Sequence, residues 1–238
     1  MPLSPEQEWT LVACGLVAHA DGILEVGEWD EVLWLLDERV QSDEVEPWID
    51  LLSNEAALRR RFEGLAPPPP MLTESILEKA WRMALADGTG TDTEREIHDE
   101  IAKKLGADLD EVEGWRAAWE ERARRRAEVV AGFAALVANS DGATEPMERA
   151  EFEDLLVRLP LPQDRRDLLR GLLDDPPEKE SLIGQTLALD PEDRGIALAA
   201  LVPVVKAAGF GKAERELFLE LADRVAIDRP HAERLLER

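Results

Sequence analysis

Acidic side chains recur at fixed distances from Asp-Gly pairs in this chain of 238 residues. Asp21 and Gly22 are followed by Glu25 and Glu28, and the same order returns in residues 141–148. The candidate oxygen ligands are Asp21, Glu25, Glu28, Asp87, Glu94, Asp141, Glu145 and Glu148. Carboxylates without thiolate or imidazole partners suit Ca²⁺ or Mg²⁺. The spacing therefore predicts divalent-cation sites of low ligand number.

We call each such segment an elbow, because one helix is expected to end at the Asp-Gly pair and another to begin shortly after it. Glycine suits the left-handed residue that closes many helices. The first elbow spans residues 20–28, the second 86–94, the third 140–148 and the fourth 207–214. The fourth has Ala208 where the others have aspartate.

Two interpretations of the elbows stay open. Aspartate can accept amide hydrogen bonds within the turn, and a glutamate such as Glu28 or Glu94 can cap the next helix, so no ligand is required. A cation is favoured by Glu25 and Glu145, because they stand at the cap position, where Ser, Thr, Asp or Asn is usual.

The chain repeats itself at an offset of 120 residues. The offset aligns Leu16-Val17-Ala18 with the same tripeptide at 136–138, and Glu94-Arg95-Glu96 with the same tripeptide at 214–216. Such self-similarity predicts a structural repeat. We therefore expect two tandem domains, residues 1–120 and 121–238, with two elbows in each.

Helical signals dominate the sequence. Ser4 and Gln7 form a capping box around Pro5, and apolar residues recur three and four positions apart, as at Val32, Leu35 and Leu36. No stretch alternates as a strand would, and the chain contains no tyrosine. The prediction is an all-α fold.

The junction between the copies is expected to be one long helix. Residues 115–131 contain neither glycine nor proline, so a helix from about Leu109 to about Asn139 is predicted, with a bend near residues 122–126 as the alternative. The arginines of this junction are expected to pair with acids on the same helix. They are Arg122, Arg124, Arg125 and Arg126, and their expected partners are Glu120, Glu121 and Glu128.

The elbow strings at 18–28 and 138–148 resemble the Ala-x-x-Asp-Gly-x-x-x-x-x-Glu signature of the TerB-like family, which includes tellurite-resistance TerB and the DjlA N-terminal domain. The resemblance implies compact helical domains with two similar halves, acidic residues linked to divalent cations, and a role in tellurite, metal or phage stress. Carried over position by position, it points to Asp21, Glu28, Asp87, Glu94, Asp141 and Glu148. Ala208 departs from the pattern.

Charge and composition narrow the function further. The chain has 52 acidic and 28 basic side chains, a net charge of −24, which disfavours nucleic acid and anionic membranes and attracts cations or basic protein surfaces. The single cysteine excludes a disulfide framework, and the three histidines form no HExxH pair. No signal peptide, nucleophile with a base, or phosphate loop is seen, so a cytoplasmic protein without enzymatic activity is expected.

A partner protein is the second functional hypothesis. All seven tryptophans lie in the first copy, which is also the more acidic. Leu33 and Trp34 align with Glu153 and Asp154 of the second copy, so the first copy has an extra apolar stripe. That stripe is covered either by packing inside the chain or by a protein partner with a basic surface. The leading hypothesis is a cation-responsive stress module, and the alternative is a cation-independent interaction scaffold.

Overall fold

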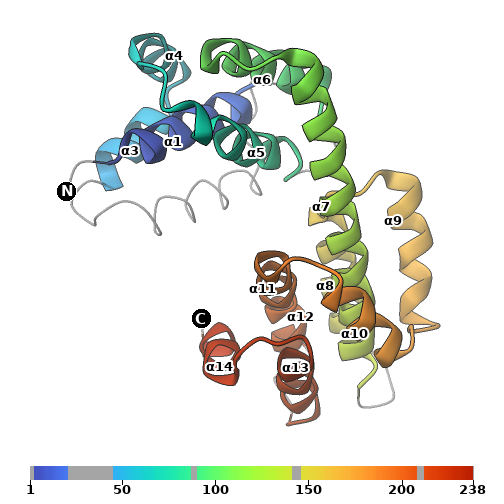
Figure 1. The fold of residues 1–238 in the computed structure, drawn as a ribbon. Helices are drawn as coiled ribbons and strands as arrows, with labels where there is room; N and C mark the ends of the chain where they lie inside the picture. Colours follow the sequence, from blue (N-terminus) through green and yellow to red (C-terminus); the bar gives the residue numbers. More distant parts are fainter. Residues whose placement is uncertain (1–2, 21–44, 87–89, 141–145, 208–211, 238) are drawn as a thin grey trace. The chain divides into compact units, whose positions relative to one another are not determined.

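The computed structural model describes residues 3–20, 45–86, 90–140, 146–207 and 212–237 (Figure 1). All regular structure within these ranges is helical, without a strand, which confirms the predicted all-α class. Several residues singled out in the sequence lie outside the described ranges. They are Asp21, Glu25, Glu28, Leu33, Trp34, Asp87, Asp141 and Glu145.

The chain divides into two compact units, Met1–Glu121 and Arg122–Arg238. The division falls inside α7 (Leu109–Ala138), a single α-helix of 30 residues that contributes to both units. The expected long helix at the junction is therefore present. Its extent agrees with the prediction to within one residue at its end.

The first unit is built around α1 (Pro5–Ala18). Every residue from Trp9 to Ala18 is buried, because other helices of the unit pack on several sides of α1. These helices are α3 (Val45–Leu52), α4 (Glu55–Gly64), α5 (Thr73–Ala84) and α6 (Asp92–Leu105). A short 3₁₀ turn, η1 (Pro70–Leu72), precedes α5.

Local sequence signals fix the ends of these helices. Ser4 Oγ accepts a hydrogen bond from the Gln7 amide at 3.2 Å, and Gln7 Oε1 accepts one from the Ser4 amide at 2.8 Å, as the capping box predicts. The proline run at 67–70 follows α4, and Trp9 Nε1 donates to the Ala66 carbonyl beside it at 2.7 Å. Thus α1 also anchors the irregular segment between α4 and α5.

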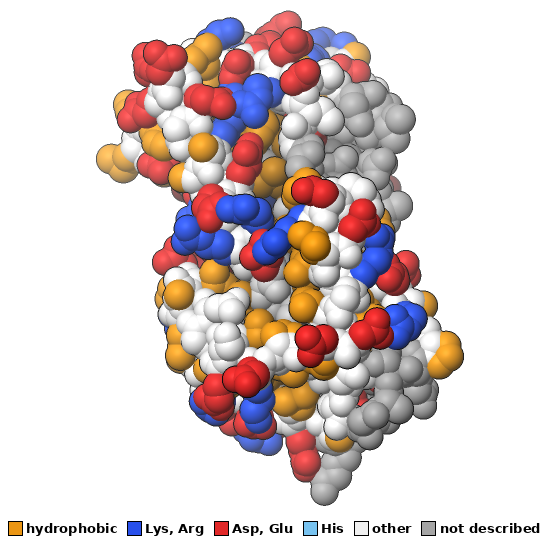
Figure 2. All heavy atoms as spheres, turned by 90° about the vertical axis from the view of Figure 1, so that its right-hand side faces the viewer, with side chains coloured by type: hydrophobic (Ala, Val, Ile, Leu, Met, Phe, Trp, Pro, Cys, Tyr) orange, Lys and Arg blue, Asp and Glu red, His pale blue; other side chains and the backbone are white. Residues whose placement is uncertain are grey.

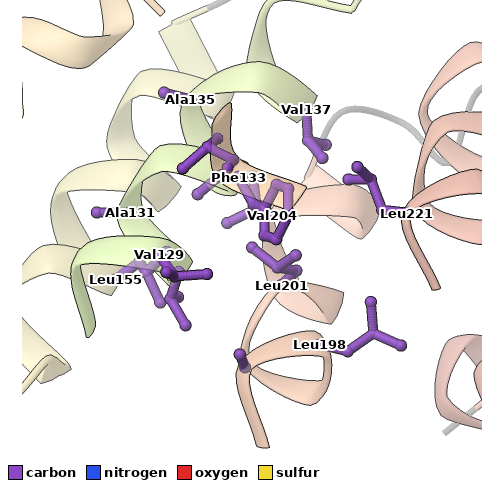
Figure 3. Packing of buried hydrophobic residues seen from close by; sticks show 14 of the residues in the cluster. Val129, Ala131, Phe133, Ala135, Val137, Leu155, Leu198, Leu201, Val204 and Leu221 are labelled. Atoms are coloured by element: carbon purple, nitrogen blue, oxygen red, sulfur yellow. The ribbon is translucent and has the colours of Figure 1, made fainter. Parts of the chain in front are cut away.

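The second unit is packed around the later half of α7. Phe133 of α7 lies in a buried cluster with Leu155, Leu201, Val204 and Leu221 (Figure 3). The other helices are α8 (Pro146–Arg158), α9 (Gln163–Leu169), α10 (Lys179–Leu187), α11 (Pro191–Ala200), α12 (Val202–Ala207), α13 (Lys212–Arg224) and α14 (Arg229–Glu237). A 3₁₀ turn, η2 (Arg170–Leu173), follows α9.

Several local structures recur in the two units at the offset of 120 residues. Gly106 after α6 has a φ of +78°, and Ala226 after α13 has a φ of +64°. The amide after each of them donates to a carbonyl five residues back, at 3.0 and 2.9 Å. Asp108 and Asp228 then each accept a hydrogen bond from the amide three residues ahead, at 3.2 and 3.1 Å. Both chain segments therefore end one helix and begin the next in the same way.

A side-chain contact recurs at the same offset. Arg59 Nη1 donates to Glu100 Oε2 at 2.7 Å in the first unit, and Lys179 Nζ donates to Glu220 Oε1 at 2.7 Å in the second. Each pair joins a helix before the second elbow of its unit to the helix after that elbow. Residues at matching positions thus make matching contacts.

The junction arginines contradict one expectation. Arg126 pairs with Asp193 of α11, and Arg122 lies 3.9 Å from both Asp190 and Asp193. Glu128, expected to pair within α7, instead accepts a hydrogen bond from Arg165 of α9 at 2.8 Å. Pairing within α7 was wrong for Arg126 and Glu128, because helices α11 and α9 place the opposite charges Asp193 and Arg165 beside them.

Candidate functional site

The last residues of three elbows are glutamates that are buried in the first turn of a helix. Glu94, Glu148 and Glu214 are each the third residue of a helix, α6, α8 and α13. Their exposed fractions are only 4%, 3% and 5%. Glutamate is seldom so buried, because removing a carboxylate from water is unfavourable unless hydrogen bonds or opposite charge compensate. These three side chains therefore form the part of the candidate site that lies within the described residues.

Glu94 completes a helix cap. Its Oε2 accepts hydrogen bonds from the Thr91 amide at 2.6 Å and from Thr91 Oγ1 at 2.8 Å. Thr91 Oγ1 in turn accepts one from the Glu94 amide at 3.2 Å. This reciprocal arrangement is a capping box. In the second elbow, one glutamate oxygen is thus already bonded to the main chain, as the ligand-free interpretation requires.

Glu214 links two elbows of the second unit. Its Oε1 accepts a hydrogen bond from Ser140 Oγ at 3.1 Å. Ser140 opens the third elbow, and Glu214 closes the fourth. The two elbows therefore meet, at least at these ends, and a carboxylate from one reaches a hydroxyl of the other.

Glu214 was not among the predicted ligands, because its elbow has lost the aspartate at Ala208. Its alignment with Glu94 at the repeat offset was the signal that could have included it. Glu148 was among them, and its burial in the first turn of α8 places it in the same kind of position. Both buried glutamates of the second unit, Glu148 and Glu214, are therefore candidate ligands.

The helix ends that lead into the first and third elbows are anchored alike. His19 Nε2 donates to the Leu52 carbonyl at 2.7 Å, at the end of α3. Asn139 Nδ2 donates to the Leu173 carbonyl at 3.1 Å, at the end of η2. With its Nε2 bonded to a carbonyl, His19 joins the end of α1 to the end of α3 and does not present that nitrogen to an ion.

A buried cluster of polar and aromatic side chains lies beside the second elbow. His98 is fully buried on α6, where its Nε2 donates to the Leu77 carbonyl at 2.9 Å. Arg116 of α7 donates from Nε to His98 Nδ1 at 3.2 Å, so Nδ1 carries no proton and the imidazole is neutral. Burial, and then the charge of Arg116, lowers the pKa of His98 to about 4.

Trp81 of α5 is the aromatic centre of this cluster. Its Nε1 donates to Glu120 Oε1 of α7 at 3.2 Å, and the guanidinium groups of Arg95 and Arg116 lie 5.4 and 5.1 Å from its ring centroid. The His98 ring meets it edge-on at 5.1 Å. Sequence patterns did not reveal this cluster, because its members come from three helices.

The second unit has apolar residues at the matching positions. Leu201, Phe218 and Leu236 stand 120 residues after Trp81, His98 and Arg116, and all three are buried. A bundle of this kind can therefore be packed with apolar side chains there. The polar cluster is a property of the first unit, whose second elbow keeps its aspartate.

Other parts of the described chain show fewer features of a binding site. No group of three or more His, Cys, Asp or Glu side chains suited to a metal occurs within the described ranges, where Cys14 is buried. None of the described helices is long and apolar enough to cross a membrane. On the face drawn in Figure 2, acidic, basic and hydrophobic side chains are intermixed, as is usual for protein surfaces.

Comparisons of the chain with protein families, curated proteins and solved structures found no match. The TerB-like resemblance therefore rests on the elbow motifs of the sequence alone.

Proposed function

We propose that this chain is a cytoplasmic, tandem TerB-like protein without enzymatic activity that binds divalent cations at its elbows. In this proposal it responds to Ca²⁺ or Mg²⁺ and acts in a stress response of the tellurite, metal or phage type. The observation that carries the proposal is the burial of Glu94, Glu148 and Glu214 at the same position of the helices that follow three elbows.

The tandem arrangement is supported by contacts that match at one offset. Gly106 and Ala226 share a left-handed conformation, and Asp108 and Asp228 share a capping role. Independent segments would have no reason to agree at a single offset in both backbone conformation and hydrogen bonding. Duplication of one helical unit explains the agreement together with the sequence identities.

Cation binding is supported by the chemistry of the buried carboxylates. Within the described part of the chain, Glu214 receives a hydrogen bond from a neutral hydroxyl, that of Ser140. A hydroxyl carries no positive charge, so a cation near the paired elbows would stabilise a buried carboxylate further. Oxygen ligands of this type suit Ca²⁺ and Mg²⁺.

The first unit is proposed as the stronger site. Both of its elbows retain the aspartate, at Asp21 and Asp87, whereas the fourth elbow has Ala208. The acidic excess is also larger before residue 120. The proposed ligands there are Asp21, Glu25, Glu28 and Asp87, with Glu94 contributing only if it is released from its capping role.

The alternative function is a cation-independent scaffold. It is favoured by the Glu94 capping box, because this carboxylate has a structural purpose that needs no ligand. The scaffold would use the acidic, Trp-rich face of the first copy around Leu33 and Trp34 to bind a basic protein surface. It predicts that divalent cations act on the protein only through ionic strength.

A thermal titration distinguishes the two functions. We expect CaCl₂ or MgCl₂ to raise the Tm by several degrees beyond a NaCl control of equal ionic strength, because a ligand of the native state stabilises it. Asp21→Asn with Glu28→Gln should remove this increment. The matched control is Glu111→Gln with Asp164→Asn, which changes the charge equally at exposed positions outside the elbows. No increment in the wild-type protein would establish the scaffold instead.

A further inference from the structure

Gly90, within the second elbow, lies against the indole ring of Trp81. A Cβ atom placed on Gly90 would lie 2.6 Å from Trp81 Cη2 and 2.7 Å from Cζ2, closer than atoms of this kind approach. The absence of a Cβ at Gly90 therefore leaves the space that the ring occupies. The Trp81 ring is fully buried, and protein interiors are close-packed, so a displacement of the ring requires its neighbours to move as well.

The same indole is also bonded to α7, through the nitrogen two bonds from Cζ2. Trp81 Nε1 donates to Glu120 Oε1 at 3.2 Å, and the Arg116 guanidinium lies over the ring. One rigid side chain therefore contacts both Gly90 and α7. A displacement of the elbow backbone at Gly90 requires a displacement of the ring, and the ring is held to α7.

We propose that Trp81 couples the conformation of the second elbow to the stability of α7 near Glu120. The part of this proposal that concerns cations rests on the proposed function, because a cation is what would move the elbow. The mechanical part does not depend on it. Since α7 continues to Ala138, the coupling acts on the helix that both units share.

The second unit supports a specific role for the indole. Leu201 stands opposite Trp81 at the offset of 120, and Val202 does so at the offset of 121 that aligns Ala208 with Asp87; neither side chain has an N–H group to donate. The elbow of that half has also lost its aspartate, at Ala208. The bonded indole and the acidic elbow thus occur together in the first unit and are absent together at the matching positions of the second, as expected if one transmits the state of the other.

Hydrogen–deuterium exchange of Gly90→Ala tests the mechanical part. We expect the amides of residues 116–121 in the full chain to exchange at least tenfold faster than in the wild type. Gly64→Ala is the matched control, because a Cβ there meets nothing within 4 Å. Exchange at 116–121 that stays within twofold of the wild type, or that rises equally in the control, would overturn the coupling.

A second variant separates coupling from general loosening of the core. Phe in place of Trp81 is shorter at the edge that faces Gly90 and lacks the indole N–H. In the Trp81→Phe background, Gly90→Ala should therefore change exchange at 116–121 by less than twofold. An undiminished effect would show that the signal does not pass through Trp81 and would overturn the proposal. Should Gly90→Ala not fold, Gly90→Ala with Trp81→Phe should fold, and its failure would also count against the contact.

Addition of CaCl₂ distinguishes failure of the coupling from failure of the proposed function. We expect exchange at residues 116–121 to change severalfold when Ca²⁺ is added to the wild type, and to stay constant in Trp81→Phe. If Ca²⁺ raises the Tm but leaves exchange at 116–121 unchanged in the wild type, the coupling is wrong and cation binding stands. If Ca²⁺ does neither, the proposed function is wrong, and the Gly90→Ala result alone decides the mechanical coupling.

Discussion

The Ser140 hydroxyl donates a hydrogen bond to the buried carboxylate of Glu214, which lies 74 residues later in the sequence. This hydrogen bond joins the start of the third elbow to the end of the fourth. It shows that the start of the third elbow and the end of the fourth approach each other within one unit. The bond also gives the buried glutamate a polar partner, without which its burial would be unfavourable.

Ser140→Ala should destabilise the protein by about 1–2 kcal/mol, because it leaves the Glu214 oxygen without its hydroxyl donor. Chemical denaturation monitored by circular dichroism measures the change. Ser181→Ala is the control, since Ser181 is exposed and accepts only a 3.3 Å bond from Gln185. Equal effects of the two substitutions would mean that the Ser140–Glu214 bond contributes nothing specific.

Ala226→Gly should stabilise the protein by roughly 0.5–1 kcal/mol. Ala226 has a φ of +64°, a left-handed conformation in which a Cβ is unfavourable and glycine is not. At the matching position, Gly106→Ala should destabilise by about 1 kcal/mol, although no atom lies within 4 Å of the added Cβ. Thermal unfolding of both variants tests whether the Tm rises for Ala226→Gly and falls for Gly106→Ala. A lower Tm for Ala226→Gly would contradict the left-handed conformation at this residue.

Acid should weaken the first unit through His98. The pKa of His98 is lowered to about 4 in the folded protein, so below pH 6.5 the unfolded chain binds protons more readily than the folded one. The contribution of His98 to stability is therefore full above pH 7 and is lost as the pH falls from 6.5 to 4. The loss is at most about 3 kcal/mol. Denaturation midpoints measured between pH 4 and 8 test this slope.

The matched control for that slope copies the second unit. His98→Phe with Arg116→Leu reproduces the apolar pair Phe218 and Leu236 at the same positions. Replacing a buried polar pair by apolar residues of similar volume is often neutral, so this variant should fold. Its stability should depend less on pH between 6.5 and 5 than that of the wild type. An unchanged slope would mean that His98 is not its source.

Glu94→Gln separates the two roles of the second elbow. Glutamine can still accept the hydrogen bonds of Thr91 and is common in capping boxes, so the free energy of unfolding should change by less than about 0.5 kcal/mol. Glu94→Ala should cost about 1 kcal/mol because the cap is lost. If Glu94→Gln alone abolished a cation response, Glu94 would be a ligand as well as a cap.

Much of the fold could be predicted from local sequence. Ser4 forms the predicted capping box and Glu94 caps its helix as one interpretation of the elbows predicted, because such bonds involve residues only three apart. The long helix α7 was predicted from the absence of glycine and proline between residues 115 and 131. In each case the interaction responsible lies within one or two helical turns of the residue that signals it.

Contacts between helices were not predictable in the same way. Arg126 pairs with Asp193, which is 67 residues away, and His98 meets Arg116 from another helix. A sequence pattern indicates which face of a helix is apolar, but not which side chain of a neighbouring helix lies opposite. For the same reason the link between Ser140 and Glu214 came from the structure, although each residue had a recognisable place in the repeat.

Isothermal titration calorimetry of the full chain with CaCl₂ and MgCl₂ tests the central claim most directly. The proposed function predicts saturable binding of at least one of these cations, lost in Asp21→Asn with Glu28→Gln and kept in Glu111→Gln with Asp164→Asn. Heats of dilution alone for both cations, or binding of the same affinity and stoichiometry in both double variants, would contradict binding at the elbows.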